Sequence, residues 1–220
     1  MNENELGNGR RRAQHLVRLQ RLTDVVYGVI ILQLFLTIPT PDSVGMRWDS
    51  LGAYLSEHGF TIAVVLIGIA FVAIYWLQSI QLLGTLRATD SIHTTLSIFQ
   101  LFFLMVFLYS LQLGVHIGGS AGTWAFESIS ATMVGLISLF AFARARKKGL
   151  LHPDVSTEEA RRMAIRYRAE PLTTSITIPF AFMAGPVIFG FSVAWEFSWF
   201  IYPIVVAIVN RIAKQKAHKR

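Results

Sequence analysis

Apolar residues gather along this chain in long runs that are separated by short polar stretches. Each run is about 20 residues long, the length of α-helix that crosses the hydrocarbon core of a bilayer. We therefore predict an all-α polytopic membrane protein with six transmembrane helices, at residues 22–40, 59–83, 92–115, 121–143, 172–191 and 193–212. The polar residues 1–13 are predicted to be a disordered cytoplasmic tail, and residues 14–220 a single six-span domain.

Composition agrees with this pattern. The chain is 53% hydrophobic and 15% charged, whereas a soluble domain carries about 25% charged residues. It contains no cysteine, so disulfides and thiolate metal ligands are both excluded.

The basic residues lie almost entirely on one side of the predicted membrane. Six spans bring both termini to the same side, and all but one of the 20 Lys and Arg residues fall there, the exception being Arg47. The positive-inside rule therefore places both termini in the cytoplasm. The net charge of +7 follows from this topology. We expect the lipid bilayer, and not nucleic acid, as the partner of these charges.

The segment 144–171 is the longest predicted cytoplasmic loop. Ser156 with Glu159 three residues later is a capping-box pattern, which predicts that a helix begins there. Pro171 is expected to end this helix. We predict a short, basic helix at the membrane interface.

Patterns for catalysis and metal binding are missing from the sequence. No zinc-protease, phosphate-loop or dinucleotide-binding motif occurs. The residues His93 and His116 have no second His, Asp or Glu at metal-ligand spacing. We therefore expect neither an enzyme nor a resident cofactor or metal.

The first span begins with a charged collar. An Asp at position 24 raises the free energy of inserting the helix into the membrane. Arg21 lies three positions before it, on the same helix face. We predict an ion pair between Arg21 and Asp24 at the cytoplasmic boundary, which sets the depth and register of the helix.

Four further residues of this span form one stripe. Val29, Gln33, Leu36 and Thr40 follow i, i+4, i+7, i+11 spacing. Gln33 is expected near the middle of the membrane, where an amide facing lipid costs several kcal/mol, so it must face another helix or water. Around a symmetry axis the stripe would form stacked rings, and apolar rings gate ion flow by dewetting.

The start of the first span carries a motif. Arg18-Leu-Gln-Arg-Leu22-Thr23-Asp24 resembles the Arg-x-x-x-Phe-Ser-Asp signature that opens the first helix of the transmembrane protein 175 family, with Leu22 for Phe and Thr23 for Ser. The sequence YWLQSIQLL, which contains Trp76, is similar to that family's Tyr-Trp-x-Asn-His-His-x-Leu-Phe. The resemblance is concentrated in the first half of the chain.

The family consists of potassium-permeable channels. The resemblance also implies a homotetramer in the cell membrane of a prokaryote. It implies that four first helices line a central pore, with the motif residues as their anchor and Trp76 as support from the second span. It also implies that the constriction is formed by Val29, Gln33 and Leu36. The resemblance implies potassium as the permeant ion, and other monovalent cations as further candidates.

The sequence departs from the family pattern at several of these positions. Val29 is smaller than the Ile or Leu usual at the main gate, and Gln33 replaces an apolar ring. Ser79 and Ile80 stand where the family has two His. We expect these changes to make the pore wetter and less selective.

Two other classes of function stay open. One is a small secondary transporter or proton-coupled carrier with Asp24 as the titrating group, although the two halves of the chain show no internal repeat. The other is a structural or lipid-associated membrane protein that conducts nothing.

Overall fold

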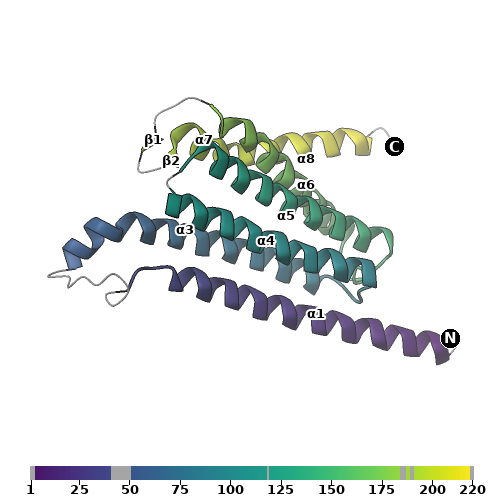
Figure 1. Ribbon diagram of the computed structural model, residues 1–220. Helices are drawn as coiled ribbons and strands as arrows, with labels where there is room; N and C mark the ends of the chain where they lie inside the picture. Colours follow the sequence, from purple (N-terminus) through teal and green to yellow (C-terminus); the bar gives the residue numbers. More distant parts are fainter. Residues whose placement is uncertain (1–2, 41–50, 118, 184–186, 189–190, 219–220) are drawn as a thin grey trace. The chain divides into compact units, whose positions relative to one another are not determined.

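The protein is described by a computed structural model in which residues 3–40, 51–117, 119–183, 187–188 and 191–218 are placed (Figure 1). Its elements are α1 (Glu3–Leu36), α3 (Leu51–Gly84), α4 (Ser91–Ile117), α5 (Ala121–Lys147), α6 (Thr157–Phe180), β1 (Val187–Ile188), β2 (Phe191–Ser192), α7 (Val193–Ser198), the 3-10 helix η1 (Trp199–Ile201) and α8 (Tyr202–His218).

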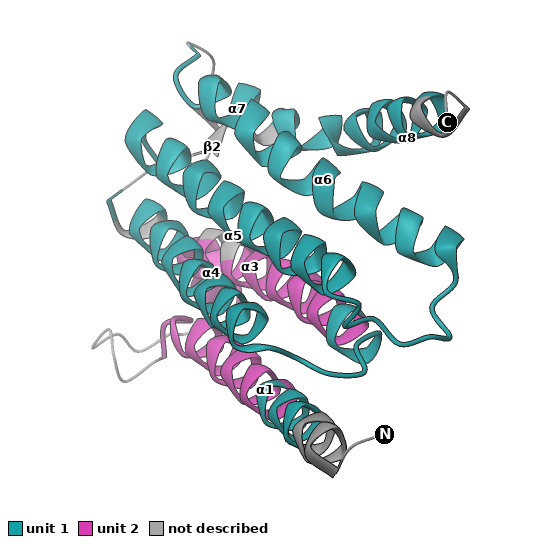
Figure 2. Ribbon diagram, turned by 90° about the vertical axis from the view of Figure 1, so that its right-hand side faces the viewer, with its two compact units in different colours: residues 1–19, 82–220 teal, residues 20–81 magenta. Residues whose placement is uncertain are grey.

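The chain divides into two compact units (Figure 2). One unit comprises residues 20–81, which hold the later part of α1 and most of α3. The other comprises residues 1–19 and 82–220. Within this second unit α4 packs on α5, α5 on α6, and α6 on α8.

By length and composition, four stretches of helix among the described residues can cross a membrane. They are Arg11–Leu36, Thr61–Gly84, Ser91–Gly114 and Ala121–Lys147. These stretches overlap the first four predicted spans and support a multi-pass membrane protein. The predicted total of six spans stays a prediction.

The beginning of the chain differs from the sequence-based expectation. Residues 1–13 are predicted to be a disordered tail, whereas α1 begins at Glu3. Further along this helix Leu16 and Leu19 are buried in an apolar cluster with Leu83, Leu86, Ala145 and Leu150. This cluster packs α1 at Leu16 and Leu19, which follow the polar residues 1–13 on the same helix.

The helix α6 also differs from the prediction. The predicted start is confirmed, because the Ser156 hydroxyl accepts a hydrogen bond from the Glu159 amide at 3.1 Å. The predicted end at Pro171 is wrong, because α6 continues to Phe180. The expected span 172–191 therefore stops being helical at Phe180. Beyond that point β1 and β2 pair antiparallel, with Val187 opposite Ser192.

Packing against α5 explains how Pro171 is accommodated inside a helix. Its nitrogen carries no hydrogen, so the helix lacks one backbone hydrogen bond at this turn, while the carbonyl of Pro171 accepts hydrogen bonds from the hydroxyls of Thr174 at 3.2 Å and Ser175 at 2.6 Å. On α5, a Cβ added to Gly135 would lie only 3.0 Å from the Pro171 nitrogen. The glycine therefore allows the two helices to approach closely at the proline.

The helix α4 is tied to the end of α5 by one carboxylate. Asp90 accepts a hydrogen bond from the His93 amide at 2.8 Å, which caps α4. Its other oxygen accepts from Arg144 Nη2 at 2.7 Å and Nε at 3.0 Å. Burial alone would raise the pKa of Asp90, but the hydrogen bonds from the His93 amide and Arg144 outweigh it and hold the pKa below its ordinary value.

The close approach at Pro171 predicts the effect of Gly135→Ala. The added methyl group must displace Pro171 backbone atoms, so we expect the free energy of unfolding to fall by about 1–3 kcal/mol. Thermal unfolding of the detergent-solubilised protein measures this change. The control is Gly122→Ala on the same helix, where a Cβ makes only an ordinary 3.8 Å contact with Ser120; an equal loss in both variants would contradict the close-packing argument.

The Asp90 ion pair predicts a pH dependence. Because the folded-state pKa of Asp90 is lowered, the carboxylate contributes stability above its unfolded pKa of about 3.9, and this contribution is lost as pH falls through the folded-state value. We expect the difference in unfolding temperature between the wild type and Asp90→Asn to be constant above about pH 5 and to shrink below it. A difference that is unchanged down to about pH 3 would exclude an ionised Asp90 as its source.

Candidate functional site

The helix α1 has a buried face that repeats every three to four residues. Its members are at most 6% exposed, and they are Leu16, Leu19, Thr23, Tyr27, Ile30 and Leu34. This spacing places them along one side of the helix. The buried face includes Thr23 of the motif, whereas Arg18, Leu22 and Asp24 are exposed.

The predicted stripe lies on another face of the same helix. Val29 is 49% exposed and Leu36 is 70% exposed, and Gln33 and Thr40 are exposed as well. At about 100° per residue Val29, Gln33 and Leu36 fall within one sector that lies well away from Tyr27 and Leu34. Thr40 lies beyond the end of α1 at Leu36. Their own chain therefore leaves all four side chains accessible.

Apolar residues extend this exposed surface toward the beginning of the helix. Leu22 is 45% exposed, Val25 63% and Leu32 56%. Together with Val29 and Leu36 they recur at alternating steps of three and four residues, the spacing that helices use to pack against a like partner. A single chain in water would not leave such a surface uncovered, so a membrane or a second chain must cover it.

Three contacts join α1 to α3 within the unit of residues 20–81. The Trp76 indole Nε1 donates to Asp24 Oδ1 at 2.9 Å. The Tyr27 hydroxyl and the Ser79 Oγ are 3.0 Å apart and share a buried hydrogen bond. The Tyr27 ring also stacks on Trp76, with 6.3 Å between ring centroids and 20° between planes. We call Asp24, Tyr27, Trp76 and Ser79 the α1–α3 clamp.

The described residues do not form the predicted ion pair between Arg21 and Asp24. Among the described residues no ion pair joins Arg21 to Asp24, and the Asp24 carboxylate accepts a hydrogen bond from Trp76 instead. A helical side chain leans toward the N-terminus of its helix, which carries the long Arg21 side chain away from Asp24. The indole supplies a donor on the neighbouring helix without a second charge.

The α1–α3 clamp contains two residues to which sequence reasoning assigned no role in the site. Tyr27 is fully buried and Ser79 is 7% exposed. Tyr27 belongs to the three-to-four-residue repeat of buried positions in α1, and this repeat is the signal that could have identified it. Ser79 was noted only as a departure from the family's His, and nothing in its sequence context names Tyr27 as its partner.

The clamp provides hydrogen-bonding groups, and the exposed stripe provides a surface of defined shape. The described residues add no metal-binding site to them. Among the residues that the structure describes, no three His, Cys, Asp or Glu side chains are grouped to hold a metal ion. Asp24 is the carboxylate of the clamp, and its described contact is the neutral indole of Trp76.

Comparison with known proteins connects this region to a family. Residues 18–107 match the family described as "Endosomal/lysosomal potassium channel TMEM175". This match confirms the resemblance that the motif of the first helix indicates. The sequence matches none of the curated proteins.

A solved structure shares the fold over nearly the whole chain. It is a crystal structure of a variant of the potassium channel MtTMEM175 in complex with a nanobody–MBP fusion protein. The two chains are 17% identical, with a TM-score of 0.65 over 90% of this chain and 93% of the other. The likeness therefore extends the shared fold beyond the segment that matches in sequence.

The clamp predicts an energetic coupling between Asp24 and Trp76. Trp76→Phe keeps a ring beside Tyr27 but removes the N–H donor, so we expect the free energy of unfolding to fall by about 1 kcal/mol. The loss should largely disappear in an Asp24→Ala background, because the acceptor is already gone. Unfolding of the single and double variants in detergent measures the coupling. Tyr109→Phe, at a 60% exposed position of α4, is the control, and strictly additive losses would contradict the contact.

Proposed function

We propose that this chain, whose residues 18–107 match the transmembrane protein 175 family, is a potassium-permeable cation channel with the first helix lining its pore. Four copies of α1 surround a central axis in the cell membrane, with both termini in the cytoplasm. Val29, Gln33, Leu36 and Thr40 face this axis. The chain is a channel subunit and not an enzyme, as both the matching family and the solved structure with the same fold are potassium channels.

The exposure of Gln33 is the observation that carries the proposal. Its amide lies in the apolar part of α1 and is exposed in the single chain. Contact with lipid would leave the amide donors and acceptor without partners at a cost of several kcal/mol. A water-filled axis, or other copies of Gln33 around it, removes this cost. Val29 and Leu36, which are also exposed, then pack against the same residues of the other copies, on either side of the Gln33 ring along the axis.

This arrangement explains how a pore without a carbonyl filter would discriminate among ions. The rings of Val29 and Leu36 offer no ligand, so an ion must pass them with part of its hydration removed or must wait for the constriction to wet. The ring of Gln33 lies between them and offers amide oxygens to the ion. Because Val is smaller than Leu or Ile, the ring at position 29 is expected to be the wider and wetter one.

The motif at the start of α1 acts on the pore indirectly in this proposal. Thr23 is buried and Asp24 is held by Trp76, so both fix how α1 is rotated and do not touch the ion. A carrier that uses Asp24 as its proton-binding group is the second candidate function. In that case transport would require a proton gradient and would saturate with substrate.

The proposal predicts opposite effects of two substitutions at one position. Val29→Ile narrows the ring and should lower potassium flux, whereas Val29→Asn supplies polar groups that wet the constriction and should raise it. We expect a change of about tenfold in each direction, equivalent to about 1.4 kcal/mol in the barrier. Potassium flux into liposomes that contain the purified protein measures both effects, with the oligomeric mass checked first.

The matched control is Phe35→Leu. Phe35 is 59% exposed on the same helix, but its position lies about 120° around the helix from Val29. Flux should be unchanged in this variant. Equal changes at positions 29 and 35, or a monomeric protein, would contradict a pore on α1, and flux that saturates and needs a proton gradient would favour the carrier.

A further inference from the structure

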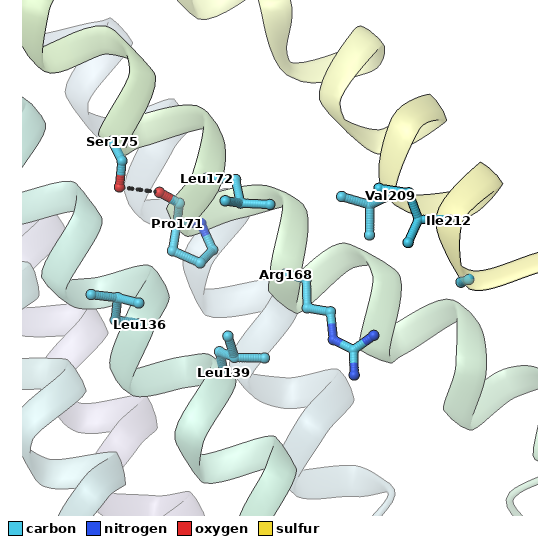
Figure 3. A pocket seen from close by; sticks show the side chains of 9 residues that line it. Leu136, Leu139, Arg168, Pro171, Leu172, Ser175, Val209 and Ile212 are labelled. Atoms are coloured by element: carbon cyan, nitrogen blue, oxygen red, sulfur yellow. Dashed lines mark hydrogen bonds between the residues drawn. The ribbon is translucent and has the colours of Figure 1, made fainter. Parts of the chain in front are cut away.

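A pocket of about 430 Å³ lies between α5, α6 and α8, within the unit that contains these helices. Leu136 and Leu139 line it from α5, Leu172 from α6, and Val209 and Ile212 from α8 (Figure 3). Its size is typical of sites that bind small molecules. The lining is apolar except for Arg168 and Ser175, and the Ser175 hydroxyl is already bonded to the Pro171 carbonyl.

Arg168 sets this pocket apart from a simple gap between helices. Its side chain is exposed at the pocket, and no hydrogen bond or ion pair links it to another residue within the described part of the chain. Other arginines of α6 do have such contacts. Arg162 lies 3.4 Å from Glu158, and Arg161 lies 3.4 Å from both Glu158 and Asn210.

Along α6 the charged residue of the pocket lining precedes its apolar part. Arg168 comes first, and Leu172 and Ser175 follow at one and two turns, so the apolar wall extends about 10 Å beyond the cation. Arg211 and Lys214 of α8 are exposed and add positive charge near Ile212. The charge pattern of the sequence predicts that this end of α6 and α8 lies on the cytoplasmic side.

We propose that this pocket binds an anionic phospholipid of the cytoplasmic leaflet. The phosphate is bound by the guanidinium of Arg168, whose planar fork matches phosphate oxygens, and one acyl chain lies along Leu136, Leu139 and Leu172. The positive charge of Arg211 and Lys214 favours a headgroup with net negative charge over a zwitterionic one. This lipid site goes beyond the proposed channel function and does not depend on it.

Native mass spectrometry of the full chain in detergent tests the proposal. The probes are phosphatidylglycerol and phosphatidylcholine with the same acyl chains, added separately. We expect the wild type to retain phosphatidylglycerol about fivefold more strongly, the effect of one charge contact at a membrane surface. Arg168→Gln removes the phosphate contact and one positive charge, so it should lower retention of both lipids and reduce this preference. Leu172→Trp fills the pocket and should reduce retention of both lipids.

The control is Arg162→Gln, which removes a charge from the same helix at a side chain that is 79% exposed and does not line the pocket. It should leave the preference unchanged. An equal loss in Arg162→Gln and Arg168→Gln would overturn the site in favour of diffuse charge attraction. Displacement of the lipid by inorganic phosphate alone would show an anion site without an acyl-chain groove. If Leu172→Trp changes the oligomeric mass and leaves lipid retention intact, the pocket is filled by a second copy, and the proposal is wrong.

Discussion

The absence of water inside a membrane is the constraint on which this structure depends. A polar group in an apolar helix must find its partner within the protein, because lipid offers none. Several hydroxyls in the apolar helices meet this constraint locally by donating to a carbonyl of their own helix, as Ser97, Ser110 and Ser138 do. Others join helices, as when Ser128 on α5 accepts from Thr177 on α6 and from the Trp195 indole on α7, both at 2.8 Å. Gln33 is different, because it is exposed in the single chain, and this difference directs attention to α1.

Much of the fold was accessible from the sequence because length and hydropathy determine which helices can cross a membrane. The first four spans could be predicted in this way, and so could the helix start at Ser156. The continuation of α6 through Pro171 could not, since it depends on the close approach of Gly135 on a different helix. The rule that proline ends a helix describes the chain alone, whereas packing between helices decides the outcome here.

The candidate site was predictable to a similar extent. The motif could be recognised, and the stripe predicted, because their residues follow the periodicity of a helix; that the stripe lines a pore stays a prediction. The partner of Asp24 was predicted wrongly, because spacing within a helix points to Arg21, whereas the contact is made by Trp76, 52 positions away. The Tyr27–Ser79 bond spans the same separation and was not anticipated. A contact between helices depends on how they pack, which one helix's sequence pattern does not specify.

The clamp and the proposed pore stripe are mechanically linked because they share one rigid helix. Tyr27 is buried by the packing of α1, and Val29, two residues later, is exposed on a different face. A slip of α1 by one residue relative to Trp76 and Ser79 would turn every side chain by about 100°, enough to move Val29 and Gln33 out of a common axis. In the proposed channel, the Asp24–Trp76 and Tyr27–Ser79 bonds therefore determine which residues meet the ion, although neither bond touches it. In that proposal, a motif that precedes the stripe on α1 governs conduction through rings that lie one to three turns away, without contact with the ion.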